Sequence, residues 1–552
     1  MCGIWAVFGS EEDVSVQCNA CHKIGHRGPD CFRMESVNHF MNCCLGFHRL
    51  AIMDDLTGMQ PMRVFSHPHV WLLYNGEIYN FRLLQRQFGF RYSTGCDGES
   101  IIHLYCHGGI EFAAQHLDGV FAFILLDTEK RKVFIGRDTF GIRPCFTLST
   151  ESGFLAICSE AKGLQELELK TISSGYKILP FPPGHVDTYQ LLANGKTAFE
   201  ERTRFHKIGQ TPLYKTVVSA KGDKTNLENI ADLLEAAVRK RLLSERRIGC
   251  LLSGGLDSSL VAALLVKNAR EAGISYPIQT FSIGMEGSPD LIAAKKVASY
   301  LGTEHHEVVM TPEDGLNAIE KVIYHLESYD ITTVRASVGM YLVSKYIKEK
   351  TDTVVIYSGE GSDELAQGYI YFHKSPSPED GDAESRRLLE DLYYFDVLRG
   401  DKSTAAWGLE IRVPFLDHLF TSYYLSLPAE DRQPKNGIEK YLLRSAFAKK
   451  GLIPNEILWR PKEAFSDGLS ATSKPWYEMI QNHLQQQVNE EDLGNAANKF
   501  PVNPPKTKEA FYYRTVFEKH YPGASNFTPY FWMPRWIEAS DPSARTLKHY
   551  KQ

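Results

Sequence analysis

Two patterns of hydrophobic and polar positions divide the chain. Up to about residue 205, short runs rich in aromatic and β-branched residues alternate with turns that contain Gly, Asp or Pro, which predicts β-strands. Helical stretches are interspersed, for example over residues 98–107. We therefore expect packed antiparallel sheets with layers of helices. The predicted strands are residues 44–53, 70–74, 120–127, 132–137 and 154–159.

From residue 227 onward, helices and strands alternate. Residues 227–243 carry apolar side chains at helical spacing. Residues 248–252 form a continuous apolar run, which is typical of a strand buried on both faces. The next predicted elements are a helix from Asp257, a strand at 278–283, a helix from Asp290 and a strand at 353–357. This alternation predicts a doubly wound parallel sheet.

The two patterns predict the domain organisation. Residues 209–226 are mostly polar without a clear period, which indicates a linker. The last 60 or so residues interleave basic and aromatic side chains, a composition that can bind single-stranded nucleic acid. Prolines interrupt this stretch, so we expect its aromatics to pack onto the preceding domain instead. The predicted segments are 1–208, the linker 209–226, 227–536 and a C-terminal tail 537–552.

Composition and charge exclude several classes of protein. The 552 residues suit two to four domains, with 43% hydrophobic and 23% charged residues, as in soluble globular proteins. A net charge of -6 gives no general attraction to nucleic acid or anionic membrane. No run approaches the ~20 apolar residues of a membrane span. The N-terminal sequence lacks the basic region of a signal peptide, so we expect a cytosolic protein without nucleic-acid or membrane partners.

Eleven cysteines are present, ten of them before residue 160. Without an export signal, we expect reduced thiols. Residues 18–22 fit the C-x-x-C-H pattern of haem attachment and half of a zinc site. Haem attachment requires an exported chain, and zinc requires a second pair of ligands at suitable spacing. Neither is evident, so we interpret these residues as surface or packing cysteines.

The loop Ser253–Ser259, with sequence SGGLDSS, follows a predicted buried strand and opens a predicted helix. Backbone N–H groups at a helix N-terminus stabilise anions. Gly254 and Gly255 allow a tight bend and a close approach to a ligand. The hydroxyls of Ser253 and Ser258 add donors. The Walker lysine is missing, but the position after a buried strand still favours a phosphate site over an ordinary turn.

A second predicted strand ends in the sequence SGEGSDE, residues 358–364. In a parallel sheet both loops lie at the carboxyl edge, where ligands bind. Carboxylates suit Mg²⁺, which holds ATP phosphates through few protein oxygens. We therefore expect Asp257 and Asp363 to bind Mg²⁺. Further on, Lys462 in the sequence RPKE can neutralise charge on the phosphates, although a surface lysine is the default interpretation.

Cys2 follows the initiator methionine directly. If Met1 is trimmed, Cys2 becomes the N-terminus, and its α-amino group titrates near pH ~8 and can take the thiol proton. This is the logic of N-terminal-nucleophile hydrolases. A cysteine at position 2 is weak support alone, so its neighbouring motifs decide the interpretation.

Four further motifs in the N-terminal region suit the recognition of glutamine. They are HRGPD at 26–30, HRLAI at 48–52, YNGEIYN at 74–80 and CDGE at 96–99. Arg49 suits the α-carboxylate as a bidentate fork, and Asp97 suits the α-ammonium. Asn75 and the Gly76 N–H suit the oxyanion that forms when a thiolate attacks the side-chain amide.

These motifs resemble a known enzyme family over nearly the whole chain. MCGIWAVFG, HRGPD, NGEIYN, DGE and GRDTFGIRP resemble class II glutamine amidotransferases, and SGGLDSSL, SGEGSDEL, GLEIRVPFLD and RPKEAFSDG resemble glutamine-hydrolysing asparagine synthetases. The resemblance implies an α/β two-domain fold. Its N-terminal part is an αββα N-terminal-nucleophile hydrolase sandwich. Its C-terminal part is a doubly wound parallel-sheet domain similar to ATP pyrophosphatases.

In that family, glutamine is hydrolysed through a cysteine thioester, and ammonia passes through an internal tunnel to the second domain. There aspartate and MgATP form β-aspartyl-AMP and pyrophosphate, and ammonia displaces AMP. The resemblance implies ATP as co-substrate, Mg²⁺ and a homodimer. The implied catalytic residues are Cys2, Asn75, Gly76, Glu360 and Lys462.

The resemblance also implies ligand-binding residues, residue by residue. For glutamine they are Arg49, Leu50, Ala51, Ile52, Met53, Asn75, Gly76, Glu77 and Asp97. For ATP they are Leu251, Ser253, Gly254, Gly255, Asp257, Ser258, Ile283, Ser358 and Gly359. For aspartate or pyrophosphate they are Thr332, Thr333 and Arg335.

Two alternative functions stay open at this point. One is a related amidotransferase that adenylates a different carboxylate, and the presence of Cys2 with all glutamine motifs counts against its β-lactam-forming members, which lack the nucleophile. The other is a non-catalytic regulatory protein that keeps the fold. Such a protein would be expected to lose Cys2, Asp257, Glu360 or Lys462, and all four are present.

Overall fold

The computed structural model describes residues 1–37, 40–165, 167, 177–216, 218–471, 473–539 and 541–543. It divides into two compact units, Met1–Lys215 with Leu243–Arg246 (unit 1) and Thr216–Leu242 with Arg247–Gln552 (unit 2). The division after Lys215 falls inside the predicted linker 209–226. Residue 217 of that linker lies outside the described residues. Residues 540 and 544–552 of the predicted tail also lie outside them.

Unit 1 contains two six-stranded antiparallel sheets within its described residues. The first has the order β10-β8-β9-β1-β3-β2, with strands Ile178–Pro180, Phe146–Ser149, Leu155–Cys158, Gly3–Phe8, Cys43–Arg49 and Cys31–Ser36. The second has the order β12-β11-β7-β6-β5-β4, with strands Thr197–Arg204, His185–Leu191, Lys132–Arg137, Gly119–Asp127, His67–Ile78 and Met62–Val64.

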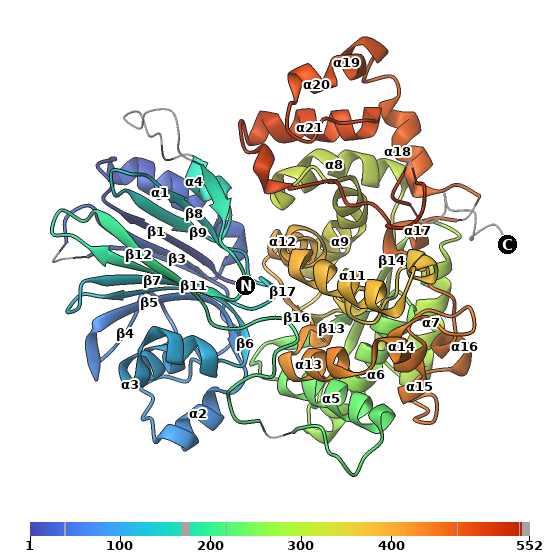
Figure 1. Ribbon diagram of the computed structural model, residues 1–552, viewed down its shortest axis with the longest axis horizontal. Coiled ribbons are helices and arrows are strands. Elements are labelled where there is room, and N and C mark those ends of the chain that lie inside the picture. The colour runs from blue at the N-terminus through green and yellow to red at the C-terminus, as the bar shows by residue number, and fades with distance from the viewer. Residues whose placement is uncertain are drawn as a thin grey trace. The chain divides into compact units, whose positions relative to one another are not determined.

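The sheets form the inner layers of a four-layer sandwich. One apolar core joins side chains such as Ile4 and Ala6 from β1 to Trp71 and Leu73 from β5. A second core joins the other face of β5 to helices α2 (Phe81–Phe88) and α3 (Glu99–His116). Helices α1 (Val14–His22) and α4 (Lys162–Gln165) lie on the opposite side of the two sheets, as Figure 1 shows. The predicted αββα sandwich is therefore confirmed.

The predicted elements of unit 1 exist, but several bounds differ. The strand expected at 44–53 ends at Arg49, because the next residues turn into a loop that Arg49 itself holds. The strand expected at 70–74 is part of the longer β5, and the helix expected at 98–107 extends to His116 as α3. β5 was underestimated because polar residues such as Asn75 and Glu77 break the apolar pattern that marks a strand. α3 was underestimated because Gly109, with a φ of 87°, interrupts the helix.

Unit 2 is built on a five-stranded parallel sheet with the order β15-β14-β13-β16-β17. The strands are Glu304–Val309, Gln279–Gly284, Arg247–Leu251, Thr353–Tyr357 and Glu410–Arg412. Helices α6 (Leu256–Glu271) and α7 (Pro289–Leu301) contact β13, β14 and β15, whereas α9 (Ile331–Lys350) and α12 (Asp396–Ala405) contact β14, β16 and β17. The doubly wound sheet predicted from the alternating pattern is confirmed.

The strand order places a topological switch point between β13 and β16. The chain leaves β13 toward β14 and β15 on one side, and it returns to β16 on the other. Ligands of open parallel sheets bind outside the carboxyl ends of the strands at such a point. The two loops that leave β13 and β16 there are the predicted phosphate loop, which begins at Ser253, and the loop that begins at Ser358.

Further helices surround this sheet. Thr225 begins α5 with a reciprocal capping box to Glu228, which satisfies two free backbone donors. The other helices and helical turns are α5 Asn226–Lys240, α8 Pro312–Leu326, α10 Ser362–Leu365, α11 Pro378–Asp391, α13 His418–Ser426, α14 Ala429–Arg432, α15 Tyr441–Phe447, α16 Asn455–Leu458, α17 Phe465–Gly468, α18 Trp476–Leu484, α19 Glu490–Gly494, α20 Ala496–Lys499 and α21 Lys508–His520. Short 3₁₀ turns lie at Gly25–Arg27 (η1, in unit 1), Ile370–Lys374, Leu392–Tyr394, Pro414–Leu416 and Ser525–Phe527.

The aromatic residues near the C-terminus pack onto unit 2. Trp532 is buried in a cluster with Tyr371, Phe372 and Phe395, and Tyr530 and Trp536 pack against the same cluster. The prediction that these side chains pack onto the domain is confirmed for the described residues.

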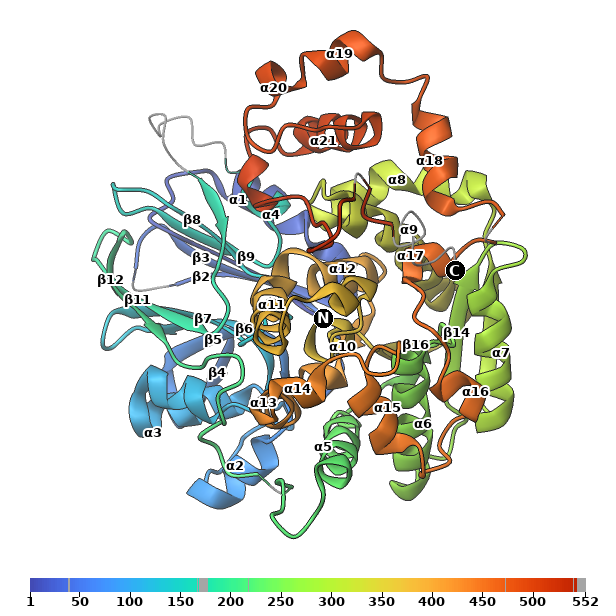
Figure 2. The ribbon, with the colours of Figure 1, turned by 45° about the vertical axis from the view of Figure 1, so that its right-hand side comes forward.

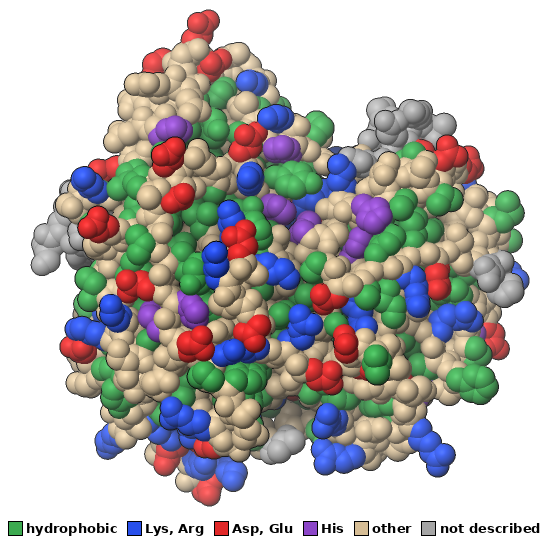
Figure 3. All heavy atoms as spheres, turned by 180° about the vertical axis from the view of Figure 1, so that it is seen from behind, with side chains coloured by type: hydrophobic (Ala, Val, Ile, Leu, Met, Phe, Trp, Pro, Cys, Tyr) green, Lys and Arg blue, Asp and Glu red, His purple; other side chains and the backbone are tan. Residues whose placement is uncertain are grey.

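Two surface properties agree with the composition. Among the described residues, no helix combines the length and the apolar character needed to cross a membrane. On the face shown in Figure 3, acidic and basic side chains are interspersed over the coloured residues. That mixture is what a net charge of only -6 over 552 residues leads one to expect.

Candidate active sites

The thiol of Cys2 lies at the end of β1, beside the end of β3. β1 pairs with β3 so that Gly3 is opposite His48. The Leu50 backbone N–H points to the Cys2 Sγ at an N–S distance of 3.4 Å. The predicted residues Leu50, Ala51 and Ile52 are buried here. β3 therefore leads directly into the loop beside the candidate nucleophile. The first N–H group of this loop, that of Leu50, points to the Cys2 sulfur.

The HRGPD and HRLAI motifs meet at this place. The Asp30 Oδ2 accepts a hydrogen bond from the Ala51 N–H at 2.8 Å, and the Asp30 N–H donates to the Arg49 carbonyl at 3.0 Å. Gly28 lies so close to β3 that a Cβ on it would come within 2.2 Å of the His48 carbonyl. Only glycine allows this approach. Gly28 therefore lets the HRGPD motif pack against β3 and position the loop after Arg49.

Arg27 of the same motif supports Cys2 from behind. Its Nε donates to the Cys2 carbonyl oxygen at 3.0 Å, and its Nη1 donates to the Glu160 Oε1 at 2.7 Å. His26 and Lys162 also contact the Glu160 carboxylate. Burial alone would raise the pKa of Glu160, but Lys162, His26 and Arg27 hold that pKa well below its ordinary value. A fully buried ion cluster thus fixes the backbone of the candidate nucleophile.

Asn75 carries an amide without a hydrogen-bond partner. β5 pairs Asn75 with Ala122, and alternation along β5 places Asn75 on the same face as Trp71 and Leu73. That face belongs to the core against which Cys2 packs. Asn75 is fully buried, and within the described residues neither its Oδ1 nor its Nδ2 has a partner. Since an unsatisfied buried amide is costly, this side chain is suited to a ligand.

The neighbouring glycine is required by the sheet itself. Gly76 has a φ of 153°, and a Cβ there would lie 1.9 Å from the Val120 carbonyl oxygen on β6. No side chain fits at this distance. The close packing of β5 on β6 therefore requires glycine here, and the role of its N–H as an oxyanion donor stays a prediction.

The predicted glutamine ligands Arg49 and Asp97 are both buried and already partnered. The Arg49 Nη1 donates to the Asp55 carbonyl at 2.8 Å, and its Nη2 donates to the carbonyls of Met53 and Asp54. Asp97 accepts from the Tyr74 hydroxyl at 2.7 Å and from the Ile78 N–H at 2.5 Å. A ligand carboxylate would thus share or displace the carbonyls on Arg49.

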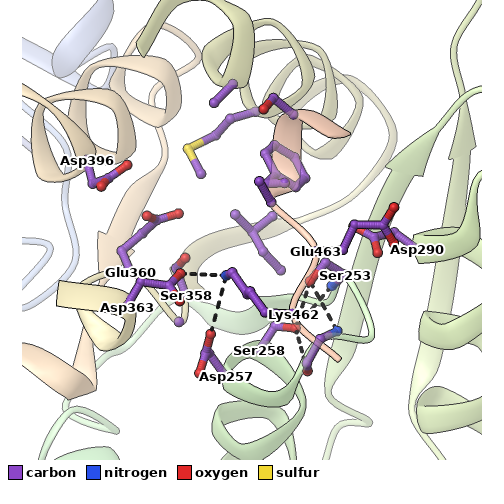
Figure 4. A pocket seen from close by; sticks show the side chains of 18 of the residues that line it. Ser253, Asp257, Ser258, Asp290, Ser358, Glu360, Asp363, Asp396, Lys462 and Glu463 are labelled. Atoms are coloured by element: carbon purple, nitrogen blue, oxygen red, sulfur yellow. Dashed lines mark hydrogen bonds and ion pairs between the residues drawn. The ribbon is translucent and has the colours of Figure 1, made fainter. Parts of the chain in front are cut away.

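A pocket at the switch point of unit 2 gathers the second set of predicted residues. Its lining includes the predicted residues Leu251, Ser253, Gly255, Asp257, Ser258, Ile283, Thr332, Thr333, Ser358, Gly359, Glu360, Asp363 and Lys462. Figure 4 shows labelled side chains from both strand-end loops around this pocket. Gly254 is not part of the lining, because its tight turn (φ 73°) packs it against Ala293 and Ala294 of α7.

The phosphate loop is held by its own hydroxyls. The Ser258 Oγ accepts from the Ser253 N–H at 3.2 Å and lies 3.1 Å from the Ser253 Oγ. The Ser253 Oγ also accepts from the Gly255 N–H at 3.3 Å. Gly255 is the N-cap of the 16-residue helix α6. The loop thus presents hydroxyls and a helix N-terminus to the pocket, which suits an anion.

Two lysines connect the two predicted metal-binding carboxylates. The Lys440 Nζ lies 2.6 Å from the Asp257 Oδ2 and 2.7 Å from the Asp363 Oδ1. The Lys462 Nζ donates to the Asp363 Oδ2 at 2.5 Å, and Figure 4 shows this side chain between Asp257 and Asp363. Burial alone would raise the pKa of Asp363, but Lys440 and Lys462 hold it well below its ordinary value. Asp363 therefore stays charged, and Lys440 holds it close to Asp257.

A second charged group lies on the other side of Asp363 and centres on Arg399 of α12. The Arg399 Nη2 donates to the Glu360 Oε2 and to the Asp396 Oδ1, each at 2.6 Å. Within the described residues the buried Nε and Nη1 of Arg399 have no partner. Burial raises the pKa of Glu360 to about 7, against the opposing effect of Arg399. This group offers free guanidinium donors beside a carboxylate that titrates near neutrality.

A buried hydrogen-bond chain continues from Asp396. The Tyr369 hydroxyl lies 2.5 Å from the Glu364 Oε1 and 3.0 Å from the Asp396 Oδ2. Burial, with the charge on Asp396, raises the pKa of Glu364 well above its ordinary value. Glu364 is therefore neutral, and the charge of this side of the pocket is carried by Glu360, Asp396 and Arg399.

Thr332 and Thr333 reach the pocket from the first turn of α9, whereas Arg335 does not. The buried Thr332 Oγ1 has no hydrogen-bond partner within the described residues. The Arg335 guanidinium instead forms bidentate contacts with Glu509 and Asp541. Among the described residues, Arg335 does not line the pocket, because the helical turn points its side chain to another face of α9; its contact with a ligand stays a prediction.

Comparisons with known proteins identify the family. The family model described as asparagine synthase matches residues 229–386 and 376–540, and the model described as glutamine amidotransferase domain matches residues 1–178. The chain belongs to the asparagine synthase family. Among curated relatives, the protein from Gallus gallus named asparagine synthetase (glutamine-hydrolyzing) is 62% identical over 100% of this chain and 99% of its own length. Proteins of the same name from Cricetulus griseus and Homo sapiens are 60% and 59% identical over the same shares.

Within this member of the asparagine synthase family, sequence reasoning missed three pocket residues that the structure adds: Asp396, Arg399 and Lys440. Arg399 and Asp396 belong to a helix whose charged residues are largely buried. Lys440 precedes α15 with a φ of 56°, in a loop with no recognisable motif. The sequence analysis singled out no motif that contains Arg399, and no sequence signal was available for Lys440.

Proposed function

We propose that this protein makes asparagine from aspartate, ATP and glutamine, with release of AMP, pyrophosphate and glutamate. The observation that carries the proposal is the presence, in one chain, of a thiol site with an unpartnered amide and a phosphate-type pocket with a lysine pair. Relatives named asparagine synthetase (glutamine-hydrolyzing) match the chain over its whole length. The proposed domains are 1–208 for glutamine hydrolysis and 227–536 for the ATP-dependent reaction, joined by 209–226 and followed by the tail 537–552.

In the first half-reaction, the Cys2 thiolate attacks the side-chain amide of glutamine. With Met1 removed, the α-amino group of Cys2 accepts the thiol proton and later gives it to the departing ammonia. The negative charge that develops on the amide oxygen is stabilised by the Asn75 Nδ2–H and the Gly76 N–H. Water then cleaves the thioester to give glutamate and restores the thiol.

Recognition of glutamine is assigned to the residues around this thiol. Arg49 binds the α-carboxylate. Its hydrogen bonds to the carbonyls of its own loop are then replaced by charge-assisted hydrogen bonds to the ligand. Asp97 binds the α-ammonium through its carboxylate oxygens, each of which can accept more than one hydrogen bond. The loop Leu50, Ala51, Ile52 and Met53, together with Glu77, completes the wall of the site.

In the second half-reaction, the β-carboxylate of aspartate attacks the α-phosphorus of ATP, and pyrophosphate leaves. The free donors of the phosphate loop bind the leaving pyrophosphate. Lys462 and Lys440 neutralise its growing charge. The nucleoside lies against Leu251, Ile283, Ser358 and Gly359.

Mg²⁺ arrives as part of the MgATP substrate, and the residues at this place fit it. Asp257 and Asp363 lie at two neighbouring strand ends and contact the same Lys440 ammonium, so both reach one point. Carboxylate oxygens are suitable ligands for Mg²⁺ beside phosphates. When present, the ion offsets phosphate charge, and the two lysines keep the Asp363 carboxylate ionised for it.

Arg399, Glu360 and Asp396 suit the aspartate substrate. Aspartate carries an α-carboxylate and an α-ammonium in addition to its reacting group. The unpartnered Nε–H and Nη1–H of Arg399 suit the carboxylate, and the neighbouring carboxylates of Glu360 and Asp396 suit the ammonium. Glu360 also accepts a proton when ammonia attacks the acyl-adenylate, since its pKa of about 7 allows proton uptake near neutral pH.

The remaining features of the proposal follow from the family and from chemistry. Ammonia formed at the first site serves as the nucleophile at the second, and an apolar path would keep it neutral. We also propose a cytosolic homodimer without nucleic-acid or membrane partners. These statements rest on the resemblance and on composition.

The test is a product assay with two nitrogen sources. The purified protein receives aspartate and MgATP with either glutamine or ammonium, and asparagine, AMP and pyrophosphate are measured. We expect all three products from both sources. Cys2→Ala should lose the glutamine-driven reaction and keep the ammonium-driven one, because only the first needs the thiol.

Other outcomes separate the alternatives. Glutamine hydrolysis without AMP or asparagine would contradict the proposed aspartate reaction. A screen of other carboxylates for AMP release would then identify a related amidotransferase. Absence of both glutamate and AMP from every mixture would leave a non-catalytic protein.

A further inference from the structure

Residues Asp541, Pro542 and Ser543 near the C-terminus connect three helices of unit 2. Asp541 contacts Arg335 on α9, with Nη1–Oδ1 and Nη2–Oδ2 distances of 2.8 Å each. Its Oδ2 also accepts from the Gln481 Nε2 on α18 at 2.9 Å. The Ser543 Oγ donates to the Asp467 Oδ1 on α17 at 2.7 Å. We call residues 541–543 the clasp; Figure 2 shows the helices α9, α17 and α18 that it joins.

The contacts of the clasp are buried and tightly paired. Arg335, Asp467 and Ser543 are buried. The same Arg335 guanidinium forms a second bidentate contact with Glu509 of α21. Burial alone would lower the pKa of Arg335, but Glu509 and Asp541 raise it well above its ordinary value. A buried guanidinium with two carboxylates keeps its geometry better than an exposed pair, because no water competes.

Asp467 ends the pocket loop that carries Lys462. Residues 460–466 line the pocket, and α17 follows without a gap. The loop has other fixed points: the Ser288 Oγ donates to the Gly468 carbonyl at 2.7 Å, and the Met285 N–H donates to the Leu469 carbonyl at 2.7 Å. Both of these connect to the β14–α7 side of the pocket, whereas the clasp connects the loop to α9. Phe465 and Leu469 also lie against Gly339 of α9, so the clasp adds a polar tie between the Lys462 loop and the helix that carries Thr332 and Thr333.

We propose that Asp541 and Ser543 are positioning residues for the ATP-dependent reaction, and that they hold α17 so that Lys462 stays at Asp363. This inference rests on the proposed function of the pocket, and it adds a residue set that touches no substrate. Arg335 then acts as an anchor for Asp541. Loss of the clasp lets α17 move away from α9, and the phosphates of ATP lose a well-placed cation.

The experiment compares Asp541→Ala, Asp541→Asn and Ser543→Ala with the full-length wild type. Ammonium-driven asparagine formation gives KM for ATP, and glutamine hydrolysis in the same samples serves as the internal control. Asp352→Ala is the matched control variant, because it removes an Asp–Arg pair with Arg247 that is exposed and lines no described pocket. Hydrogen exchange reports on the Asp467 and Gly468 amides, which donate to the Ala464 carbonyl.

We expect Asp541→Ala to raise KM for ATP about tenfold, the scale of effects transmitted through packed elements. Exchange at Asp467 and Gly468 should accelerate, while glutamine hydrolysis stays within twofold of wild type. Asp541→Asn keeps the shape and one acceptor, so its effect should be smaller. The double variant Asp541→Ala with Ser543→Ala should be less than additive, because both residues act through one tie.

Three results would contradict the proposed positioning role of the clasp. One is an unchanged KM for ATP and unchanged exchange in Asp541→Ala. The second is an Arg335→Lys variant that raises KM while Asp541→Ala does not, which would instead support direct ligand contact by Arg335. The third is a parallel loss of glutamine hydrolysis and melting temperature, which would mean general destabilisation. A wild type that forms no asparagine from ammonium would refute the proposed function, and the exchange comparison would still test the clasp.

Discussion

The two candidate sites handle charge in opposite ways. Around Cys2, the side chain offered to the reacting amide is the neutral Asn75, which is buried and has no hydrogen-bond partner among the described residues. In the switch-point pocket, most charged groups are already paired: Asp257 and Asp363 with Lys440, Lys462 with Asp363, and Glu360 with Arg399. At the first site, Asn75 meets a negative charge that forms only during the reaction. The second receives charges that arrive with the substrate.

This difference predicts how each site responds to substitution. An unpartnered neutral donor costs stability in the free protein, so its removal should harm only catalysis. A paired charge leaves its partner buried and alone when it is removed, which costs about 3–5 kcal/mol. Substitutions in the pocket should therefore combine loss of activity with loss of stability. The four predictions below test this contrast, from the largest expected effect to the smallest.

Lys440→Ala should cause the largest loss. Asp257 and Asp363 would repel each other and the phosphates, and a defect of about 4 kcal/mol would lower ammonium-driven synthesis about 10³-fold. The melting transition of unit 2 should also fall. Lys435→Ala removes an exposed pair with Asp431 and should change neither quantity. Retention of activity in Lys440→Ala would show that the lysine does not organise the carboxylates.

Asn75→Ala should reduce glutamine hydrolysis about 10²-fold, which is the usual scale for one oxyanion donor. Its melting temperature should be unchanged or higher, because the amide has no partner to lose. Asn80→Ala is the matched control: the Asn80 amide is satisfied by the His116 carbonyl and the Asp118 N–H. That variant should lose stability instead. The reverse pattern in the two variants would refute the role of Asn75.

Arg399→Lys should raise KM for aspartate about tenfold. The ammonium keeps the charge beside Glu360 but lacks the planar donors that suit a carboxylate. KM for ATP should change little, since Arg399 lies on the opposite side of Asp363 from Lys462. Arg386→Lys, in an exposed pair with Asp382, serves as the control. Equal increases in both KM values would argue against a selective aspartate contact.

The pH dependence of synthesis should follow Glu360. Burial raises its pKa to about 7, so the carboxylate that accepts a proton is lost as the pH falls through neutrality. At a fixed concentration of neutral ammonia, the rate should drop about twofold between pH 8 and pH 7. Removal of the Arg399 charge should move the midpoint upward, because that cation favours the ionised form. A midpoint near the ordinary glutamate value would contradict this assignment.

The sequence predicted the parts of the fold that leave a periodic signal. The buried strands at Ile248 and Val354 appear as continuous apolar runs, because parallel strands are covered on both faces. β5 was cut short at Tyr74, since Asn75 and Glu77 point into the site and break the apolar alternation. β17, with only Glu410 to Arg412, is too short for any pattern. Functional residues thus obscured the very strand that carries them.

The sequence predicted the site residues that belong to recognisable motifs. It did not predict those that reach a site only through the packing of distant segments. Position after a strand was enough to place Ser253 and Asp363 at one sheet edge. It gave no information on Lys440, which reaches the same carboxylates from a loop more than 70 residues further on. Motif position was also a poor guide to the orientation of Arg335: its neighbours Thr332 and Thr333 line the pocket, but the helical period turns the Arg335 side chain toward Glu509 and Asp541.

The burial of Trp532 has a consequence for the order in which the protein becomes active. Trp532 lines the nucleotide pocket, and its N–H donates to Asp330 at the start of α9. All of unit 1, in contrast, is contained in residues up to Arg246. At ~5–20 residues per second, a ribosome completes the thiol site some tens of seconds before it has supplied the last wall of the pocket. A growing chain therefore acquires the means to release ammonia well before it acquires the means to use it.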